Sequence, residues 1–320
     1  MPNAYCLLPI AYCLNFFTHA LSFLMSEESS KKHILFIINP ISGIGNHHGV
    51  EHLITERLDS ARFNSSIIYT NSQGHASEIS REAAADGVEI IVAVGGDGTV
   101  NETAAGLIGT ESALAIIPAG SGNGLARHLK IPMNKKRAID VINHGKVQKI
   151  DTATINDQLF VNLAGVGFDA SVAKKFASAG KRGFSTYFRI TTNSYKNYEP
   201  KQYTLVIDGK VIKRRALLIS FANSNQFGNN TSIDPTASID DGFIDVCIVG
   251  KMPYWKALLL APLLFLKKFD QTKYIEIIRA KEVVLKRKKG KSIHLDGDPK
   301  TMGKELTMRI NPLSLNVIVP

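Results

Sequence analysis

The chain has 320 residues, 44% of them hydrophobic, and a formal net charge of +10 at pH 7. This length and apolar content are ample for a sizeable core, and we expect two domains. The positive charge indicates an anionic partner but leaves a nucleotide, a nucleic acid and an acidic membrane surface all open. Because cysteine occurs only at Cys6, Cys13 and Cys247, the sequence excludes a disulfide framework and a zinc-ligand cluster and fits a reducing cytoplasm.

Residues 1–30 form an apolar leader that we expect to lie outside the fold. The leader has neither the cationic start nor the A-x-A cleavage site of a signal peptide. Pro9, Asn15 and His19 interrupt its apolar run, so its length is marginal for a membrane-spanning helix. We therefore interpret Met25 as the true start, with a membrane anchor as the alternative.

Strand and helix patterns alternate from Lys31 onward. Short apolar runs predict buried strands, and apolar residues at helical spacing predict helices between them. The expected strands cover residues 33–39, 64–70, 88–96 and 112–122, and the expected helices cover residues 50–59, 75–87 and 99–108. This alternation predicts a doubly wound parallel sheet in an α/β domain of residues 31–148, with ligands bound beyond the carboxyl ends of its strands.

Beyond about Gly145 the apolar runs become continuous or alternate with period two, and turn residues separate them. This pattern predicts an all-β, sandwich-like domain over residues 149–320. We expect two helical pieces to interrupt it, around residues 170–196 and 254–269. One alternative for its C-terminal end is to pack back on the first domain.

Two glycine-rich loops follow neighbouring predicted strands. In "IIVAVGGDGTVNE" (residues 90–102) an apolar run ends in glycines and a helix follows, which places free backbone N–H groups and a helix N-terminus together as an anion site. The alternative is a plain connection with Asp97 or Thr99 as a helix cap. The stretch "IPAGSGNGLARHL" (residues 117–129) repeats the arrangement one unit later, with Ser121 and Asn123 as polar groups. Two such loops at adjacent strand ends favour the anion site.

Five motifs occur in order: "NPISG", "GGDGTVNE", "PAGSGNGLAR", "DDGFIDV" and "LDGD", which begin at Asn39, Gly95, Pro118, Asp240 and Leu295. Together they resemble the diacylglycerol kinase catalytic-domain superfamily of ATP-dependent lipid kinases, which includes sphingosine kinases and bacterial lipid kinases. The resemblance covers essentially residues 31–320. The resemblance implies a nucleotide-binding domain of the NAD kinase and phosphofructokinase-like type. NAD kinases share this domain with the family, and "GGDGT" taken singly is also their mark.

The resemblance also implies where ATP binds. Phosphoryl transfer mainly requires the protein to position the phosphates and balance their charge, so backbone donors and small hydroxyls suffice. The Asp97 carboxylate would repel ATP unless a magnesium ion or a transferable proton intervenes, so its role is metal-linked or acid–base. The implied nucleotide-binding residues are Asn39, Ser42, Gly43, Thr70, Gly95, Gly96, Asp97, Gly98, Thr99, Val100, Asn101, Glu102, Gly120, Ser121, Gly122 and Asn123.

In "DDGFID" the resemblance implies a Mg²⁺ site made by the Asp241 carboxylate and the backbone carbonyls of Ser238 and Phe243. Oxygen ligands suit this hard cation, although one carboxylate alone binds it weakly. The alternative is an Asp-Gly hairpin turn between two strands, which can coexist with a metal.

In "LDGD" the resemblance assigns the general base to Asp298, where the family usually has glutamate. A carboxylate here would accept the proton of the lipid hydroxyl as its oxygen attacks the γ-phosphate. Aspartate is one methylene shorter, which affects its reach, and the alternative is again an Asp-Gly turn. A second departure follows "NPISG", where relatives often place basic residues and this chain has Asn46, His47 and His48.

Residues 252–270, "MPYWKALLLAPLLFLKKFD", have the composition of an interfacial helix, with aromatic residues, leucines and lysines. The segment is too short, and too interrupted at Pro262, to span a membrane. A helix that packs into the core of the β domain is the alternative, and the one that the apolar pattern favours. The basic run "KRKKGK" (residues 286–291) would either attract anionic lipid or protect an exposed hairpin edge.

The sequence thus predicts a Mg²⁺-dependent kinase that transfers the γ-phosphate of ATP to a lipid hydroxyl, with diacylglycerol as the first substrate and a sphingoid base as the second. An NAD kinase and a non-catalytic nucleotide- or lipid-binding regulator are the alternatives. The expected partners are ATP and a lipid substrate at a membrane surface, with a homodimer left open. No nucleic acid is expected, because basic residues are not interleaved with aromatic stacking platforms. We expect a cytoplasmic enzyme, peripheral at the inner membrane face.

Overall fold

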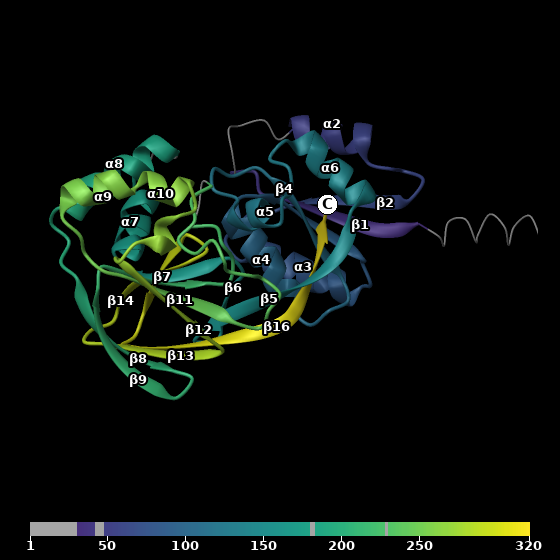
Figure 1. Cartoon of the computed structure of the whole chain (residues 1–320). Helices are drawn as coiled ribbons and strands as arrows, with labels where there is room; N and C mark the ends of the chain where they lie inside the picture. The colour runs from purple at the N-terminus through teal and green to yellow at the C-terminus, as the bar shows by residue number, and fades with distance from the viewer. Residues whose placement is uncertain (1–30, 42–47, 180–182, 228–229) are drawn as a thin grey trace, which may run out of the picture.

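The computed structural model describes residues 31–41, 48–179, 183–227 and 230–320, and it shows an α/β half beside a β-rich half (Figure 1). Four parallel strands form the sheet of the α/β half, in the order β2-β1-β3-β4. Apolar residues fill β1, β3 and β4, and these strands are buried along nearly their whole length because both faces of the sheet are covered. The strands are β1 (Lys32–Ile38), β2 (Phe63–Tyr69), β3 (Ile90–Gly95) and β4 (Ala113–Pro118).

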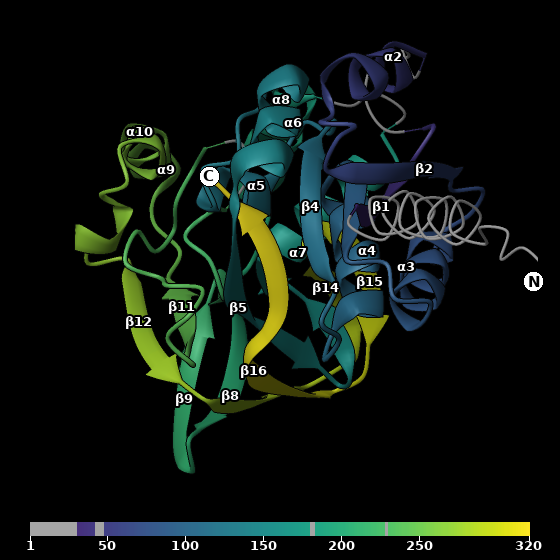
Figure 2. The same ribbon diagram turned by 90° about the vertical axis from the view of Figure 1, so that its right-hand side faces the viewer.

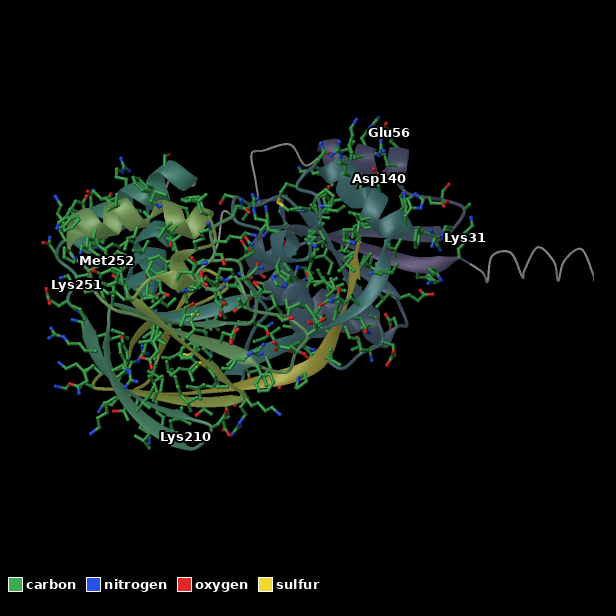
Figure 3. The ribbon with its side chains drawn as sticks, in the orientation of Figure 1. Lys31, Glu56, Asp140, Lys210, Lys251 and Met252 are labelled. Atoms are coloured by element: carbon green, nitrogen blue, oxygen red, sulfur yellow. The ribbon has the colours of Figure 1, made fainter. Side chains whose placement is uncertain are left out.

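Helices pack on both faces of this sheet. On one face α2 packs against α6, and on the other α3 packs against α4 (Figure 1). An ion pair of 3.1 Å between Arg57 and Asp140 joins α2 to α6, and Figure 3 labels Asp140 at that junction. The helices are α2 (His48–Arg57), α3 (His75–Ala85), α4 (Asp97–Leu107), α5 (Gly124–His128) and α6 (Lys135–His144). The doubly wound α/β fold predicted from the sequence is therefore confirmed.

The second half is a β-sandwich, which is also as predicted. One sheet is antiparallel and runs β12-β11-β10-β7-β14-β15. Its strands are β7 (Leu163–Gly167), β10 (Leu218–Ala222), β11 (Ile244–Val249), β12 (Ile275–Ala280), β14 (Lys291–Leu295) and β15 (Asp298–Met302). The facing strands are β5 (Lys146–Ile155), β6 (Gln158–Phe160), β8 (Lys201–Ile207), β9 (Lys210–Ala216), β13 (Glu282–Arg287) and β16 (Glu305–Val319). Buried apolar side chains of both sheets, including Val166 and Phe221 from one and Leu205 and Val283 from the other, form a shared core.

The long C-terminal strand β16 connects the two halves. Near its end Asn316 pairs with Ala113 in a parallel ladder with β4 and, on its other side, with Lys149 of β5. Strand β16 pairs antiparallel with β5 along most of its length and with β13 in its first part. Figure 2 shows β16 curving upward beside β5 and β4. As a result the sheet of the α/β half continues into the sandwich, in the order β2-β1-β3-β4-β16-β13-β8-β9.

Helices interrupt the sandwich where the sequence predicts them. They are α7 (Phe168–Ala177), α8 (Phe184–Tyr195), α9 (Tyr254–Leu260) and α10 (Pro262–Phe265), followed by a short 3-10 helix, η1 (Phe269–Gln271). Helix α7 packs on β14 and β15, and α8, α9 and α10 gather at the end of the sandwich away from the α/β sheet (Figures 1 and 2). Within the part of the chain that the structure describes, no helix is long and apolar enough to cross a bilayer.

Candidate nucleotide and acceptor site

The carboxyl ends of the four parallel strands lie at one edge of the sheet. The ladders pair Ile38 at the end of β1 with both Tyr69 and Val94, and they pair Gly95 with Pro118. Asn39 and the two glycine loops therefore follow strands that end side by side. The Asn39 side-chain amide donates a 3.1 Å hydrogen bond to the Thr99 hydroxyl, which fixes the end of β1 against the first turn of α4. Thr70 joins the same edge, because its N–H donates to the Ile38 carbonyl at 2.9 Å.

The two glycine loops touch each other through their backbones. A Cβ atom added to Gly120 would lie 2.6 Å from the Cα of Gly96, and one added to Gly95 would lie 2.3 Å from the Thr99 hydroxyl oxygen. Such separations are too short for any side chain, so glycine is required at these positions. The Asn123 side chain closes the second loop, since it accepts the Gly120 N–H at 3.1 Å and donates to the Gly120 carbonyl at 2.7 Å.

Asp97 ties the first glycine loop to the second. Its carboxylate accepts the backbone N–H of Asn123 at 2.9 Å and that of Gly124 at 2.6 Å, at the N-terminus of α5. Burial raises the pKa of this carboxyl group, and the two backbone hydrogen bonds oppose that rise. A Cβ on Gly122 would lie 2.6 Å from the Asp97 carboxylate. The contacts give Asp97 a positioning role, and its metal-linked or acid–base role stays a prediction.

The other predicted nucleotide residues differ in their surroundings. Ser121 is exposed in the second glycine loop, and Gly98 is exposed in the first turn of α4. Val100, in contrast, has a buried side chain, and its N–H donates to the Gly96 carbonyl at 3.1 Å, so its polar group is already used within the fold. Glu102 is half-buried one turn further along α4. Ser42 and Gly43 lie outside the described residues.

Asp296, the first aspartate of "LDGD", organises the junction between the halves. It is buried, and its carboxylate accepts backbone N–H groups from three successive residues, Val161, Asn162 and Leu163, each at 2.9 Å. It also accepts the side-chain amide of Asn101 on α4 at 2.7 Å. Burial raises its pKa, and these hydrogen bonds counteract that effect. We predicted no role for Asp296 from the sequence, although its place in the "LDGD" motif was a signal that could have indicated one.

Asp298 begins β15 on the exposed side of the same turn. Its side chain is 43% exposed and forms a 2.9 Å ion pair with the Lys300 ammonium group. Gln73, in the loop that leaves the end of β2, donates a 3.3 Å hydrogen bond to the same carboxylate. The structure therefore brings this predicted residue to the edge where the glycine loops lie. Its role as general base stays a prediction, and neither Gln73 nor Lys300 was singled out from the sequence.

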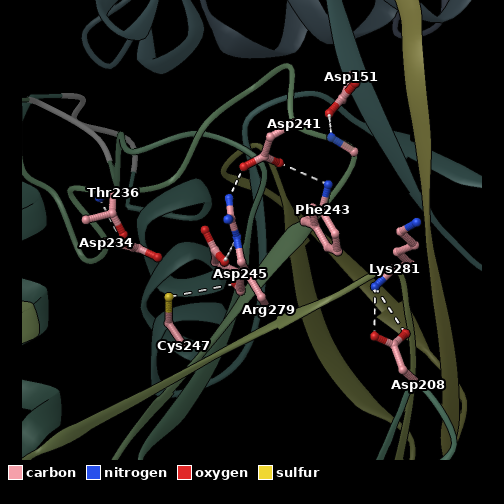
Figure 4. Close-up of polar contacts among 11 residues, drawn as sticks. Asp151, Asp208, Asp234, Thr236, Asp241, Phe243, Asp245, Cys247, Arg279 and Lys281 are labelled. Atoms are coloured by element: carbon pink, nitrogen blue, oxygen red, sulfur yellow. Dashed lines mark hydrogen bonds and ion pairs between the residues drawn. The ribbon is translucent and has the colours of Figure 1, made fainter.

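In the "DDGFID" turn, both carboxylate oxygens of Asp241 contact other protein groups. One oxygen accepts the Phe243 N–H at 3.0 Å, and the other contacts the Arg279 guanidinium (Figure 4). Asp151 also secures the turn, since its carboxylate accepts the N–H of Gly242 at 2.6 Å. Ser238 donates its hydroxyl to the neighbouring Asp240 at 2.6 Å. Among the described residues, no group of three or more His, Cys, Asp or Glu side chains is arranged to hold a metal ion. As arranged, these residues do not fit a bound Mg²⁺ ion.

Residues 252–270 show features of both an interfacial helix and a helix packed on the core of the sandwich. Leu260, Leu263 and Leu264 pack partly against an apolar cluster of the sandwich. Trp255 and Leu259 on the other side of α9 are 62% and 69% exposed, and α9 and α10 contain no buried residue. The segment therefore covers the core with one side and presents apolar side chains with the other.

The basic run of residues 286–291 covers the end of β13, the connecting residues 288–290 and the start of β14. The Arg287 guanidinium binds backbone carbonyls around this connection, among them that of Met302 on β15 at 3.0 Å, and Lys286 forms a 3.2 Å ion pair with Glu305. The predicted hairpin edge is wrong, because β13 pairs with β8 and β16 while β14 pairs with β7 and β15, so the two strands belong to different sheets and neither is an edge strand.

Comparisons with known proteins cover nearly the whole described chain. Residues 33–155 match the family model described as diacylglycerol kinase catalytic domain, and residues 162–319 match the YegS C-terminal NAD kinase beta sandwich-like domain. A diacylglycerol kinase of Bacillus subtilis (strain 168) is 27% identical over 274 residues, which are 83% of this chain and 90% of that protein. A Chromohalobacter salexigens protein named "Probable lipid kinase YegS-like" is 29% identical over 251 residues, covering 76% of this chain and 80% of the relative.

A solved structure shows the same fold. The crystal structure of a diacylglycerol kinase from Bacillus anthracis (strain Sterne) has a TM-score of 0.70 and 24% sequence identity, and the match covers 90% of this chain and 97% of that one. At this identity the likeness supports the fold alone.

Proposed function

Since the chain belongs to the diacylglycerol kinase catalytic-domain superfamily of lipid kinases, we propose that it transfers the γ-phosphate of ATP to the hydroxyl group of diacylglycerol, with a sphingoid base as the second choice. Residues 31–148 would bind ATP, and residues 149–320 would bind the lipid. The observation that carries this proposal is the contact of Asp298 with Gln73, because it joins the predicted base to the strand edge that carries the glycine loops.

The packing of the glycine loops supports an ATP site at this edge. Gly95, Gly96 and Gly120 leave the backbone bare where phosphates would approach, and the N-terminus of α4 adds N–H groups with a favourable dipole. Asp97 holds the second loop in place by accepting two of its N–H groups. Mg²⁺ would enter as the counter-ion of the ATP phosphates, whose charge it neutralises. No step of the proposal uses Asp241.

Asp298 supplies the acid–base chemistry in this proposal. As the lipid hydroxyl oxygen attacks the γ-phosphorus, its proton passes to the Asp298 carboxylate, the bond from the γ-phosphorus to the bridging oxygen breaks, and ADP leaves. The exposure of this side chain, 43%, leaves it accessible to a substrate. Lys300 and Gln73 both contact one oxygen of the carboxylate, Oδ2, which orients the side chain before the substrate arrives.

Helices α9 and α10 are proposed to contact the membrane that holds the lipid. Trp255, Leu259 and Leu266 are each more than half exposed, and together with the neighbouring Lys256 and Lys267 they combine apolar and cationic groups at one end of the sandwich. That combination suits the interface of an anionic bilayer, where lysine contributes about 1 kcal/mol per residue near the surface. The enzyme would then work as a peripheral protein at the inner membrane face.

Transfer of label from ATP tests the proposal. The purified protein would be incubated with Mg²⁺ and γ-labelled ATP against diacylglycerol, sphingosine, monoacylglycerol, ceramide and NAD, in mixed micelles. We expect label in diacylglycerol first. Label in sphingosine alone would assign the second substrate class, and label in NAD alone would overturn the lipid assignment in favour of an NAD kinase. ATP binding without any labelled product would favour a non-catalytic regulator.

A further inference from the structure

Two carboxylates contact one guanidinium group at the outer strands of the sandwich, and a third carboxylate lies next to them. Asp245 on β11 lies directly opposite Arg279 on β12 in the antiparallel register. Asp241 reaches the same guanidinium from the "DDGFID" turn, and Asp234 lies beside Asp245 (Figure 4). Three aspartates from one segment and an arginine from the next strand thus form one charged cluster.

Arg279 makes three contacts in this cluster, two with carboxylates and one with an aromatic ring. Its Nη2 atom contacts the Asp241 carboxylate, and its Nε atom lies 3.6 Å from an oxygen of Asp245. Its guanidinium carbon lies 5.2 Å from the centre of the Phe243 ring, which is within the range of a cation–π interaction. A planar guanidinium suits this task, because its N–H groups are fixed in a fork that can serve two carboxylates at once.

The cluster contains more acidic side chains than basic ones. Asp234 is fully buried, and one of its carboxylate oxygens has no hydrogen-bond partner among the described residues, while the other accepts the N–H and the hydroxyl of Thr236. Asp245 is also buried. Buried carboxylates are costly without a compensating cation, so the position of Arg279 stabilises the turn and the strands that contribute them.

We infer that Arg279 takes the place of the divalent cation that the sequence motif implies at Asp241, so that a guanidinium and not Mg²⁺ holds the "DDGFID" turn of this chain. Mg²⁺ needs nearly octahedral coordination by oxygen at about 2.0–2.1 Å. In this structure the Arg279 guanidinium already lies against one Asp241 oxygen, while the other oxygen accepts the Phe243 N–H, so the positive charge that Mg²⁺ would bring to the carboxylate is supplied by arginine. This inference concerns the structure of the turn and does not depend on the substrate of the enzyme.

Removing the guanidinium should leave room for a cation. Asp241 and Asp245 would then flank a position that has lost its positive charge, and Mg²⁺ is commonly bound by one or two carboxylates with water completing its coordination. A cation that binds only the folded protein raises its melting temperature. The inference therefore predicts that a response to Mg²⁺ appears in a variant and is lacking in the wild-type protein.

Thermal unfolding without nucleotide tests this, with each protein measured in a chelator and in excess Mg²⁺. The wild-type melting temperature should be the same in both, while Arg279→Met should melt at a lower temperature in chelator and rise by about 2 °C or more in Mg²⁺. Adding Asp241→Asn to Arg279→Met should abolish that rise. Arg214→Met is the matched control, because Arg214 forms a 2.7 Å ion pair with Glu276 on the same strand β12 but does not contact the carboxylate cluster.

Two results would overturn the inference. One is a wild-type melting temperature that rises in Mg²⁺ and loses this rise in Asp241→Asn. The other is an Arg279→Met protein that folds but does not respond to Mg²⁺. If Arg279→Met does not fold, Arg279→Gln serves in its place, since it keeps part of the side-chain packing and one N–H donor group while removing the charge.

Discussion

The side-chain amide of Gln73 donates a hydrogen bond of 3.3 Å to the carboxylate of Asp298, across 225 positions of the sequence. Gln73 lies in the loop that follows β2 in the α/β half, and Asp298 is the first residue of β15 in the sandwich. The contact therefore brings a carboxylate of one half to the strand edge that carries the glycine loops of the other. In the proposed enzyme, the phosphoryl donor and the acceptor meet at this junction.

The contact between the glycine loops predicts a steric requirement at Gly120. Gly120→Ala should lower the free energy of unfolding by about 1–3 kcal/mol and weaken ATP binding, because the new Cβ would meet the Gly96 backbone at 2.6 Å. Denaturant unfolding and calorimetric titration with ATP measure the two effects. Gly98→Ala is the control for stability, since a Cβ there has no atom within 4 Å. Equal stability of the two variants would contradict the proposed packing.

Asp97 is expected to act by positioning the second glycine loop. Asp97→Asn should weaken ATP binding and cost about 1–3 kcal/mol of stability, because an asparagine amide group would face a backbone N–H where the carboxylate now accepts one. ATP titration and thermal unfolding check this, with the exposed Asp86→Asn as the control. A variant that keeps its ATP affinity and stability but loses turnover would instead favour the predicted metal-linked or acid–base role.

His128 makes the junction of the halves sensitive to acid. Burial lowers its pKa from the usual 6.5, and its ring nitrogen Nδ1 lies 2.9 Å from the side-chain oxygen of Asn225 in the sandwich half. The folded protein thus binds this proton more weakly than the unfolded chain does, so the contribution to stability is complete above pH 6.5 and is lost as the pH falls through the folded pKa.

We therefore expect the wild type to lose more of its free energy of unfolding than His128→Asn between pH 7 and pH 5, as measured by urea unfolding. Parallel losses in both proteins would show that another group causes the acid sensitivity.

The exposed side of α9 and α10 should carry the attachment to membranes. Replacing Trp255 and Leu259 with serine should reduce binding to vesicles of phosphatidylcholine and phosphatidylserine by about 10-fold or more, because two large apolar groups no longer leave water. Vesicle sedimentation measures the bound fraction. Val211→Ser is the control, since Val211 is 64% exposed but lies on strand β9. Unchanged vesicle binding by the double variant would exclude this surface as the attachment site.

Local sequence patterns predicted the elements and the loops well. The apolar run of β3 is recognisable because helices cover both faces of the sheet, so every residue of the strand is buried. Glycine is required at Gly95 and Gly120 by close contacts at the strand ends themselves. The resemblance of the motifs to the diacylglycerol kinase superfamily is confirmed by the family models that match both halves. Motif order therefore indicated the family and the fold class.

Contacts between distant segments were beyond the reach of those patterns. Arg279 opposes Asp245 only because β11 and β12 pair in one register, and a shift by one residue would turn Arg279 to the other face. Likewise, Asp296 binds Asn101 only after the two halves have joined. The amphipathic helix α9 was ambiguous for a different reason, since one face packs on the core while the other is exposed.

The most direct test of the account is the rate of phosphoryl transfer to diacylglycerol by the wild type and by Asp298→Asn, at saturating ATP and with ATP affinity measured on the same samples. A general base contributes about 100-fold to 10,000-fold, so we predict a loss in kcat of that size with unchanged ATP affinity, and substantial activity in Asp298→Glu. An Asp298→Asn enzyme that phosphorylates diacylglycerol at the wild-type rate would contradict the assignment of Asp298 as the base.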